Sequence, residues 1–531
     1  MPKQLLPYRN TNSFSNLICD YLDQKDGTKA FYGLFPSLEN FKQQAEAKKK
    51  SFGTETRELL VKCLKKQYNG FQISEETQKN LEALKNTSTF TITTGHQLNL
   101  FTGPLYFLYK IFSVINLSEE LNSKHASMHF VPVYWMATED HDFEEINYFN
   151  FAGKKMVWEK DGGGAVGEYD TKGLKEVYKL LKLEFGQGES AQELLELFES
   201  SYLNHRNLAD ATRNLANELF KEYGLVIVDG NDAQLKSAFV PFAEKELTGQ
   251  LGFQKISKTS KRLVEAGYAE QVHPREINLF YLNSGLRERI IEKDGHYFIN
   301  DTEISFSKEE ILDDLNSHPE RFSPNALLRP LYQEVILPNI CYTGGGGELA
   351  YWFQLKEYFE ELEVEFPILL LRNSALLVSQ SLHKKLDKLN VDISELFMKP
   401  HELASVHTKR ISEIEIDFSP QREHLQKQFE ELYQLAKKTD ASFLGAVGAQ
   451  EKKQLNGLDH LEKRLLKAQK RKLKDELERL ELIQSALFPN ENLQERAKNF
   501  SEFYLEQGSD LLKLVKENLD PLANEFTIIY T

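Results

Sequence analysis

The sequence has only three cysteines, and they lie far apart in the chain. Cys19, Cys63 and Cys341 form no CxxC pair, so neither a disulfide framework nor a zinc site built on cysteines is indicated. No stretch approaches the roughly 20 apolar residues of a membrane-spanning helix, and no secretion signal opens the sequence. We therefore expect a cytoplasmic protein in a reducing compartment that has no membrane partner.

Positive charge is also scarce. The 65 lysine and arginine side chains are outnumbered by 80 aspartates and glutamates, which gives a formal net charge of −15. Such an excess disfavours binding to a phosphate backbone unless a basic patch is segregated, and the one candidate, residues 467–474, lies within a helical charge pattern. We expect no nucleic-acid partner.

Four short apolar runs, each ending in polar residues, predict the strands of a parallel sheet. The runs are 90–97, 129–142, 223–232 and 366–374. Their apolar positions are continuous, which is typical of strands buried on both faces. Helix-like stretches lie between them, at 105–121, 208–222 and 349–361. This alternation predicts an α/β fold with a Rossmann-like, doubly wound parallel sheet.

The core is expected to span residues 1–375 and to begin with a helical segment. A chain of 531 residues exceeds what one hydrophobic core usually organises. The gaps after the second and third apolar runs are much longer than a simple crossover requires. They predict insertions near 150–200 and 235–320.

The sequence pattern changes beyond the core, where leucines recur three or four residues apart among charged side chains. This pattern predicts an α-helical coiled-coil arm over 376–490. The imperfect heptads fit a hairpin within one chain or a dimer seam, and we expect a homodimer formed through the arm. Residues 491–531, which finish in the strand-like NEFTIIY, are expected to return to the core.

Ligands of open α/β sheets bind beyond the carboxyl ends of the strands, so the polar residues there are site candidates. The first cluster, in a turn before a helix, contains Gly95, His96, Gln97 and Asn99. Backbone N–H groups at such a turn can bind an anion, and the side chains would add directional donors. Ordinary turn chemistry is the competing interpretation.

The second cluster follows the second run and contains Glu139, Asp140, His141 and Asp142. Alternation along a strand would place Asp140 and Asp142 on one face. General acid–base work, contact with an ionic substrate and structural hydrogen bonding all fit these residue types. We expect no metal site, because no second group with metal-ligand spacing accompanies the cluster.

The third candidate is a run of four glycines in an apolar, aromatic segment. Consecutive glycines are costly to order and are expected where the backbone approaches a ligand or takes positive φ; a flexible loop is the alternative. Glu348 would open a helix whose N-terminus faces an anion, and Arg329 could clamp a carboxylate or phosphate. The candidates of this region and of the fourth strand end are Arg329, Tyr342, Gly344, Gly345, Gly346, Gly347, Glu348, Trp352, Arg372 and Asn373.

The sequence offers little support for nucleophilic catalysis. It contains no G-x-S-x-G motif, and its serines and histidines are scattered. Cys341 beside the glycine run could be imagined as a nucleophile. A small buried hydrophobic residue is the favoured interpretation of this unpaired cysteine.

Four long motifs, in order and followed by the predicted arm, resemble the bacillithiol synthase family. They read TTGHQLNLFTGPLYFLYKI, VPVYWMATEDHDFEEIN, SPNALLRPLYQEVILPNICYTGGGGELAYW and FPILLLRNS. The resemblance covers essentially the whole chain. It implies a Rossmann-like core, a coiled-coil domain that mediates dimer formation, and a ligase that joins L-cysteine to the amine of glucosaminyl malate in the last step of bacillithiol biosynthesis.

The family is similar in architecture to class I aminoacyl-tRNA synthetases, in which an H-x-G-H loop binds ATP. Here the turn reads Thr93-Thr94-Gly95-His96, so only the second histidine matches, and no K-M-S-K-S sequence is present. The resemblance leaves ATP open as a cosubstrate and implies no tightly bound cofactor. We expect no zinc, because the cysteine ligands that hold it in cysteinyl-ligase relatives are absent.

Amide formation needs an activated carboxylate, and this requirement suggests roles for the clusters. His96 with the Gly95 turn would stabilise a phosphate or leaving group. Asp140 and Asp142 would hold or deprotonate an ammonium, while Arg329 and the glycine backbone would bind a carboxylate. The alternative interpretation is a coiled-coil assembly or scaffold protein with a non-catalytic Rossmann core.

Overall fold

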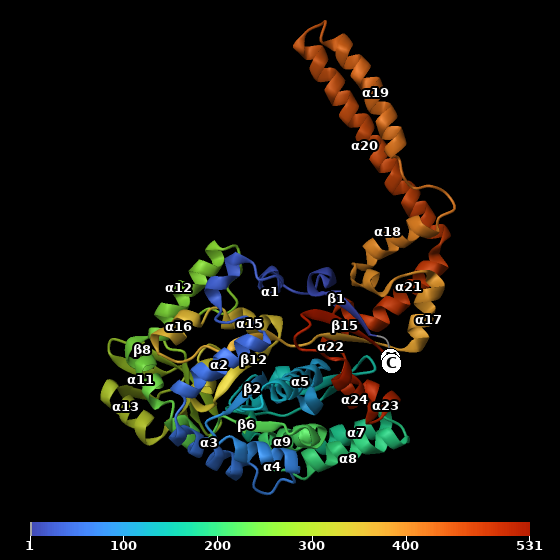
Figure 1. The fold of residues 1–531 in the computed structure, drawn as a ribbon. Coiled ribbons are helices and arrows are strands. Elements are labelled where there is room, and N and C mark those ends of the chain that lie inside the picture. The colour runs from blue at the N-terminus through green and yellow to red at the C-terminus, as the bar shows by residue number, and fades with distance from the viewer. Residues whose placement is uncertain (1–2) are drawn as a thin grey trace.

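Five parallel strands form the central sheet of the computed structural model, which describes residues 3–531. In sheet order they are β13 (Ile368–Leu371), β12 (Asn339–Gly344), β2 (Thr89–His96), β3 (His129–Met136) and β6 (Val226–Asp229). β2, β3, β6 and β13 are the four predicted apolar runs, so the doubly wound α/β fold is confirmed (Figure 1). β12, which lies between β13 and β2, was not predicted from the sequence.

Helices between the strands pack against this sheet. The long helix α5 (Tyr106–Lys124) contacts β2 and β3, α2 (Leu38–Ser51) contacts β12, and α9 (Leu208–Phe220) contacts β6. Most side chains of α5 are buried, because apolar residues occupy nearly every side of this helix. Further N-terminal helices are α1 (Asn16–Leu22), α3 (Thr54–Gln67) and α4 (Glu75–Ala83).

Both predicted insertions carry their own secondary structure. The first contains a hairpin of β4 (Tyr148–Phe151) and β5 (Lys154–Val157), followed by α7 (Leu174–Glu184) and α8 (Glu189–Phe198). The second contains α11 (Val240–Gly249), α12 (Leu251–Glu265) and α13 (Lys308–Ser317). Its antiparallel sheet has the order β10 (Ser305–Ser307), β9 (His296–Ile299), β8 (Leu286–Lys293), β7 (Leu279–Asn283) and β11 (Phe322–Pro324).

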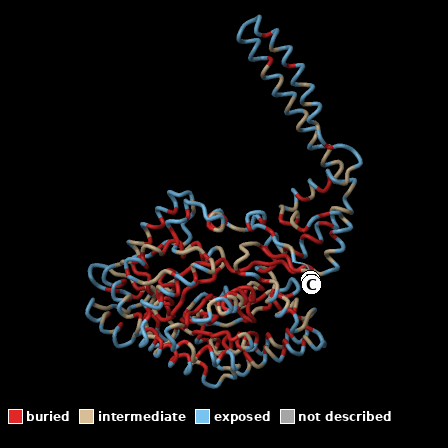
Figure 2. Tube along the Cα trace, viewed as in Figure 1, coloured by how far each residue is buried: buried red, intermediate tan, exposed pale blue. Residues whose placement is uncertain are grey.

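A helical arm projects from this body (Figure 1). Its long helices α19 (Ser419–Ala436) and α20 (Ala441–Lys472) form an antiparallel hairpin within one chain, with a small core of Phe429, Ala436 and Val447. Figure 2 shows that most of the hairpin is exposed. The base consists of α17 (Gln380–Leu389), α18 (Pro400–Ile411) and α21 (Lys474–Leu487). The predicted homodimer and the domain limits at 375 and 490 stay predictions.

The C-terminal segment packs against the body. It contains α22 (Gln494–Ala497), α23 (Phe500–Gln507), α24 (Asp510–Asn518) and the predicted strand β15 (Glu525–Tyr530). β15 pairs with β1 (Lys3–Pro7) and β14 (Ala375–Val378), so the two ends of the chain share a three-stranded sheet. Among residues 3–531, no helix has the length and apolarity to cross a membrane.

A buried ion pair joins this segment to the body. Arg372 Nη2 donates to Glu495 Oε1 at 2.7 Å, and both side chains are almost fully buried. Glu495 also accepts hydrogen bonds from the Ser374 hydroxyl and the Ala375 N–H. Three donors would therefore lose their acceptor if this carboxylate were removed.

We predict that Glu495→Ala destabilises the folded protein by about 3–5 kcal/mol, because it leaves the Arg372 charge buried and unpaired. Urea unfolding of the full chain measures this loss. Glu413→Gln is the control, since Lys472 and Glu413 form a pair on the exposed surface, and its unfolding midpoint should stay at the wild-type value. Equal midpoints for all three proteins would contradict the expectation.

Candidate active site at the carboxyl edge of the sheet

A cavity of about 1070 Å³ lies where β2, β3 and β12 end, beneath the antiparallel sheet of the second insertion. His96, Met136 and Asp229 are register partners at the ends of β2, β3 and β6, so these strands finish at one level. Twelve of the predicted site residues line the cavity: Gly95, His96, Gln97, Glu139, Asp140, His141, Arg329, Tyr342, Gly345, Gly347, Glu348 and Arg372.

The buried Lys110 and the partly buried Glu348 form an ion pair at this edge. Lys110 Nζ lies 2.7 Å from Glu348 Oε2 and donates to the Gly95 carbonyl at 2.6 Å. Burial lowers the pKa of Lys110, and the Glu348 charge opposes that shift. Burial alone would raise the pKa of Glu348, but Lys110 and two further donors bring it below its ordinary value. The pair joins α5, β2 and the segment after β12.

The glycine run brings the backbone close to Glu348. α15 (Gly346–Trp352) starts directly after β12, and the Gly345 N–H donates to Glu348 Oε2 at 2.8 Å. A Cβ atom at Gly344 would lie 2.9 Å from the Tyr342 ring and 3.1 Å from Glu348 Cβ. The φ angles of all four glycines lie outside the left-handed region, so close packing rather than positive φ is the structural reason for Gly344.

His96 is buried beside the ion pair and is neutral near pH 7. Burial lowers its pKa to about 3, and the positive charge of Lys110 adds to the shift. Its Nε2 atom is buried and has no hydrogen-bond partner within residues 3–531. The ring packs against Tyr106 and Phe107. The unpartnered nitrogen of a neutral imidazole can donate a hydrogen bond to a ligand or accept one from it, according to the tautomer.

The turn after His96 has an unusual backbone. Phe101 and Thr102 both have positive φ, at 48° and 68°, which is uncommon for a bulky or β-branched residue. The C-terminal segment holds this turn, because Asn499 Nδ2 donates to the carbonyls of Phe101 and Gly103 at 2.8 and 2.6 Å. Tyr202 accepts a hydrogen bond from the Phe101 N–H. The turn is thus fixed by residues far away in the sequence.

Asp140 lines the same cavity from the loop that follows β3. Its Oδ2 accepts from Gln97 Nε2 at 2.8 Å, and its Oδ1 accepts from the His141 N–H at 2.8 Å. Arg287 Nη1 lies 2.7 Å from His141 Nδ1, and since arginine only donates, this nitrogen is the acceptor. Gln97 and Asp140 therefore connect the first two predicted clusters.

Glu139 contacts a buried lysine in the same loop. Its Oε1 lies 2.5 Å from Lys236 Nζ, and Lys236 also donates to the Glu320 carbonyl at 2.9 Å. Both side chains are largely buried. The ion pair connects the loop to the second insertion. The charge of Glu139 is therefore already balanced by that of Lys236.

Two predicted site residues, Arg372 and Arg329, differ in how far protein side chains already occupy their guanidinium groups. Arg372 is paired with Glu495 and stacks 4.7 Å from the Tyr106 ring centroid. Arg329 donates through Nη1 to Gln333 Oε1 at 2.9 Å, while its buried Nη2 has no hydrogen-bond partner in the described chain. Arg329 is therefore the better placed of the two to bind an anionic ligand.

Six predicted residues lie outside the cavity lining. Asn99 donates to the Glu145 carbonyl, Asn373 donates to the Asp520 carbonyl, and Trp352 stacks on Tyr342. The others are Asp142, Gly344 and Gly346. The expectation that Asp140 and Asp142 share a strand face was wrong, because β3 ends at Met136 and both residues belong to the following loop. Cys341 is fully buried in β12, where burial raises the pKa of its thiol.

Several cavity residues were not identified from the sequence. Among them are the aromatic residue Tyr106 and five cations, which are Lys110, Arg275, Arg287, Arg289 and Arg496. Lys110 had a detectable signal, since it is the only charged residue in the largely apolar first part of α5, residues 106–118. Residues 268–290, which contain the three arginines of the second insertion, are basic and aromatic in the sequence and were expected near this edge, but no single arginine was predicted as a site residue, and Arg496 had no local signal. Within residues 3–531, histidine, cysteine and acidic side chains form no group of three or more that could hold a metal ion.

The sequence matches two descriptions of one protein family. Residues 1–373 match "Bacillithiol biosynthesis BshC, N-terminal Rossmann-like domain", and residues 375–531 match "Bacillithiol biosynthesis BshC, C-terminal coiled-coil domain". Together these matches cover nearly the whole chain and agree with the observed sheet and arm.

Individual relatives are similar over their full length. A Christiangramia forsetii protein named "Putative cysteine ligase BshC" is 56% identical over 533 residues, covering 100% of this chain and 99% of that protein. A Flavobacterium johnsoniae protein of the same name is 55% identical over 529 residues, covering 100% of both. A solved structure described as a "putative arginyl t-RNA synthetase" from Campylobacter jejuni covers 82% of this chain and 97% of that one, at 10% identity; its TM-score of 0.21 supports no argument.

The pKa of His96 predicts a pH dependence of stability. Between about pH 6.5 and 3 the unfolded chain binds a proton at His96 and the folded chain does not, so stability falls as pH falls. From pH 7 to 4 this term amounts to about 3 kcal/mol at most. We predict that His96→Gln, which cannot titrate, loses less stability over this range than the wild type. Chemical unfolding at several pH values measures the difference, and parallel curves would contradict it.

Proposed function

Because this chain belongs to the BshC family of bacillithiol biosynthesis proteins, we propose that it is a ligase that joins L-cysteine to the amine of glucosaminyl malate. The observation that carries the proposal is the cavity at the carboxyl edge, which is lined both by Arg329, whose Nη2 has no partner in the described chain, and by the acidic loop after β3. An amino acid and an acidic amino sugar offer the complementary groups. The proposal includes a cytoplasmic location and a homodimer formed through the arm.

The malate part of the substrate suits the side of the cavity that contains Arg329. Its guanidinium carbon lies 5.5 Å from the Tyr342 ring centroid and 5.8 Å from that of Trp135, so aromatic rings limit its movement. The free Nη2 can donate to a carboxylate, and such charge-assisted hydrogen bonds are about twice as strong as neutral ones. Gly345 and Gly347 at the start of α15 allow the ligand to approach the backbone.

An amine fits the side of the cavity that contains Asp140. One carboxylate oxygen accepts a hydrogen bond from Gln97 and the other accepts one from the N–H of His141, and these bonds orient the group. An ammonium could pair with it and then give up a proton. Asp140 is therefore assigned as the group that holds and deprotonates the attacking amine.

Activation of the cysteine carboxylate is assigned to ATP. The carboxylate oxygen attacks a phosphorus atom of ATP, which gives an acyl-adenylate and pyrophosphate or an acyl-phosphate and ADP. The sugar amine then attacks the carbonyl carbon, the C–N bond forms, and AMP or phosphate leaves. His96 and the Gly95 turn lie where they could donate to the leaving phosphate, and Lys110 holds that turn through the Gly95 carbonyl.

We predict that Asp140→Asn lowers kcat by at least about 100-fold, because an amide cannot accept the proton of the amine. Formation of bacillithiol by the purified variant, followed by mass spectrometry, measures the loss. The surface variant Asp313→Asn serves as the control and should retain wild-type turnover, with unchanged oligomer size for both proteins. Silent substitutions at the cavity together with loss of function on truncation of α19 and α20 would instead support the scaffold interpretation.

We also predict stoichiometric nucleotide use. Mixing the protein with ATP, L-cysteine and glucosaminyl malate should release one pyrophosphate or one phosphate for each amide bond formed. Coupled detection of both anions alongside product measures the ratio and identifies the activated species. Product formed without turnover of nucleotide would remove ATP from the scheme.

A further inference from the structure

Gln333 is the one side chain within residues 3–531 that accepts a hydrogen bond from Arg329, and Tyr351 is a further side chain close to the guanidinium. Gln333, one helical turn later in α14 (Arg329–Ile336), accepts the hydrogen bond from Arg329 Nη1 through its Oε1 atom at 2.9 Å. The ring contacts with Trp135 and Tyr342 limit the plane of the guanidinium but do not fix its rotation. The amide of Gln333 therefore determines which Arg329 nitrogen is left for a ligand.

The amide of Gln333 is itself oriented by a buried carboxylate. Its Nε2 donates to Glu334 Oε1 at 2.9 Å. A carboxylate only accepts hydrogen bonds, so the NH₂ end of the amide must face Glu334 and the oxygen must face Arg329. A flipped amide would place two donors against Arg329. The charge of Glu334 thus selects the amide orientation that Arg329 requires.

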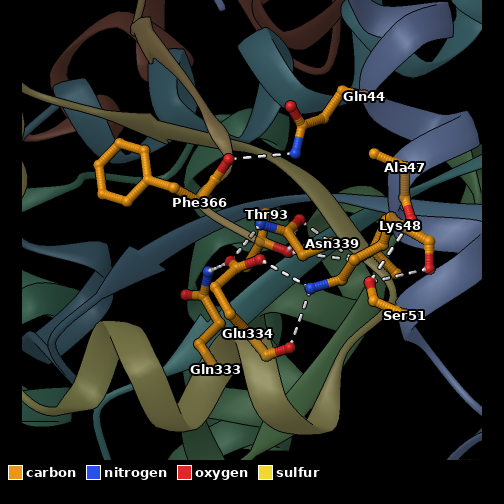
Figure 3. A network of polar contacts seen from close by, with 10 residues as sticks. Gln44, Ala47, Lys48, Ser51, Thr93, Gln333, Glu334, Asn339 and Phe366 are labelled. Atoms are coloured by element: carbon orange, nitrogen blue, oxygen red, sulfur yellow. Dashed lines mark hydrogen bonds and ion pairs between the residues drawn. The ribbon is translucent and has the colours of Figure 1, made fainter. Parts of the chain in front are cut away.

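Burial raises the pKa of Glu334, and Lys48, Asn339 and Gln333 oppose that shift because each favours the carboxylate form. Lys48 Nζ, from α2, lies 3.3 Å from Glu334 Oε2 and donates to the Glu334 carbonyl at 3.0 Å. Asn339 Nδ2, from β12, donates to Glu334 Oε1 at 2.6 Å, and Asn339 Oδ1 accepts from the Thr93 hydroxyl of β2 at 2.8 Å. Figure 3 shows the side chains of Lys48, Gln333 and Asn339 around the Glu334 carboxylate.

We propose that the buried pair Lys48–Glu334, acting through Gln333, is a positioning device that fixes the Arg329 guanidinium for the acidic substrate. Neither Lys48 nor Glu334 lines the cavity, so both act only through the intervening amide. The inference rests on the proposed function in one respect, which is that Arg329 binds a carboxylate of glucosaminyl malate.

Stability alone is a poor explanation for this pair. Lys48 is 2% exposed and Glu334 is 0% exposed, so both charges have lost their hydration. Apolar side chains of similar volume often replace such a pair without loss of stability, because the attraction barely repays the desolvation. A buried charge with a fixed direction has a clear use where it orients a neighbouring amide and, through it, an arginine in a cavity.

The test compares the KM values for the two substrates. Gln333→Met removes the acceptor for Arg329, and the double variant Lys48→Met/Glu334→Gln removes both buried charges together, so that neither is left unpaired. We expect each to raise the KM for glucosaminyl malate by about tenfold, the effect of losing one oriented hydrogen bond to a charged group, while the KM for cysteine stays within twofold.

Arg57→Met is the matched control. Arg57, from α3, is also a fully buried cation, and its Nη1 donates to the carbonyls of Leu84 and of Thr89 in β2; within residues 3–531 no hydrogen bond links it to Arg329. This variant should lower the melting temperature and leave the KM for both substrates unchanged. It shows the effect of a loss of stability that does not change the position of Arg329.

A double-mutant cycle with Arg329→Ala separates positioning from general damage. Once Arg329 is absent, Gln333→Met should change the KM for glucosaminyl malate by less than about twofold, because coupled residues are not additive. Additive effects would overturn the positioning role and leave the site intact. So would a wild-type KM for the Gln333→Met and Lys48→Met/Glu334→Gln proteins while Arg329→Ala raises the KM. An Arg329→Ala protein with wild-type KM would overturn both the role of Arg329 in the proposed function and this inference.

Discussion

Parallel pairing of β12 between β2 and β13 is the constraint on which the rest of the site depends. Strands that run in one direction deliver their last residues to one edge, so the end of β2 and the glycine run after β12 emerge together. Polar groups buried at that edge must be paired. Lys110 and Glu348 satisfy this requirement and join the Gly95 carbonyl to the Gly345 N–H. The cavity is built around this junction.

Much of the architecture could be predicted from local patterns. Four strands had continuous apolar runs, and the arm had leucines at helical spacing. In each case the spacing of apolar residues within the element reflects which of its faces are buried. β12 had no such signal. It is bounded by Pro338 and the glycines and includes the polar Asn339, so its strand conformation depends on pairing with two neighbours that lie far away in the chain. The strand that completes the site was for this reason not identified.

The candidate site could be predicted where its residues sit at strand ends, and not where they arrive from elsewhere. His96, Asp140 and Glu348 follow strands and line the cavity. Arg287 comes from an antiparallel sheet in an insertion, and Asn499 fixes the turn after His96 from nearly 400 positions away in sequence. Asp142 was placed by strand alternation, which stopped applying at Met136. Tertiary contacts of this kind leave no pattern in a single sequence.

The central claim is that both substrates meet in the cavity at the carboxyl edge of the sheet. A crystal structure of the protein with glucosaminyl malate bound tests it most directly. The account predicts a malate carboxylate within hydrogen-bond distance of Arg329 Nη2 and the sugar amine facing Asp140. Ligand density on another surface, such as the groove that contains Glu193 and Glu222 or the helices of the arm, would contradict it.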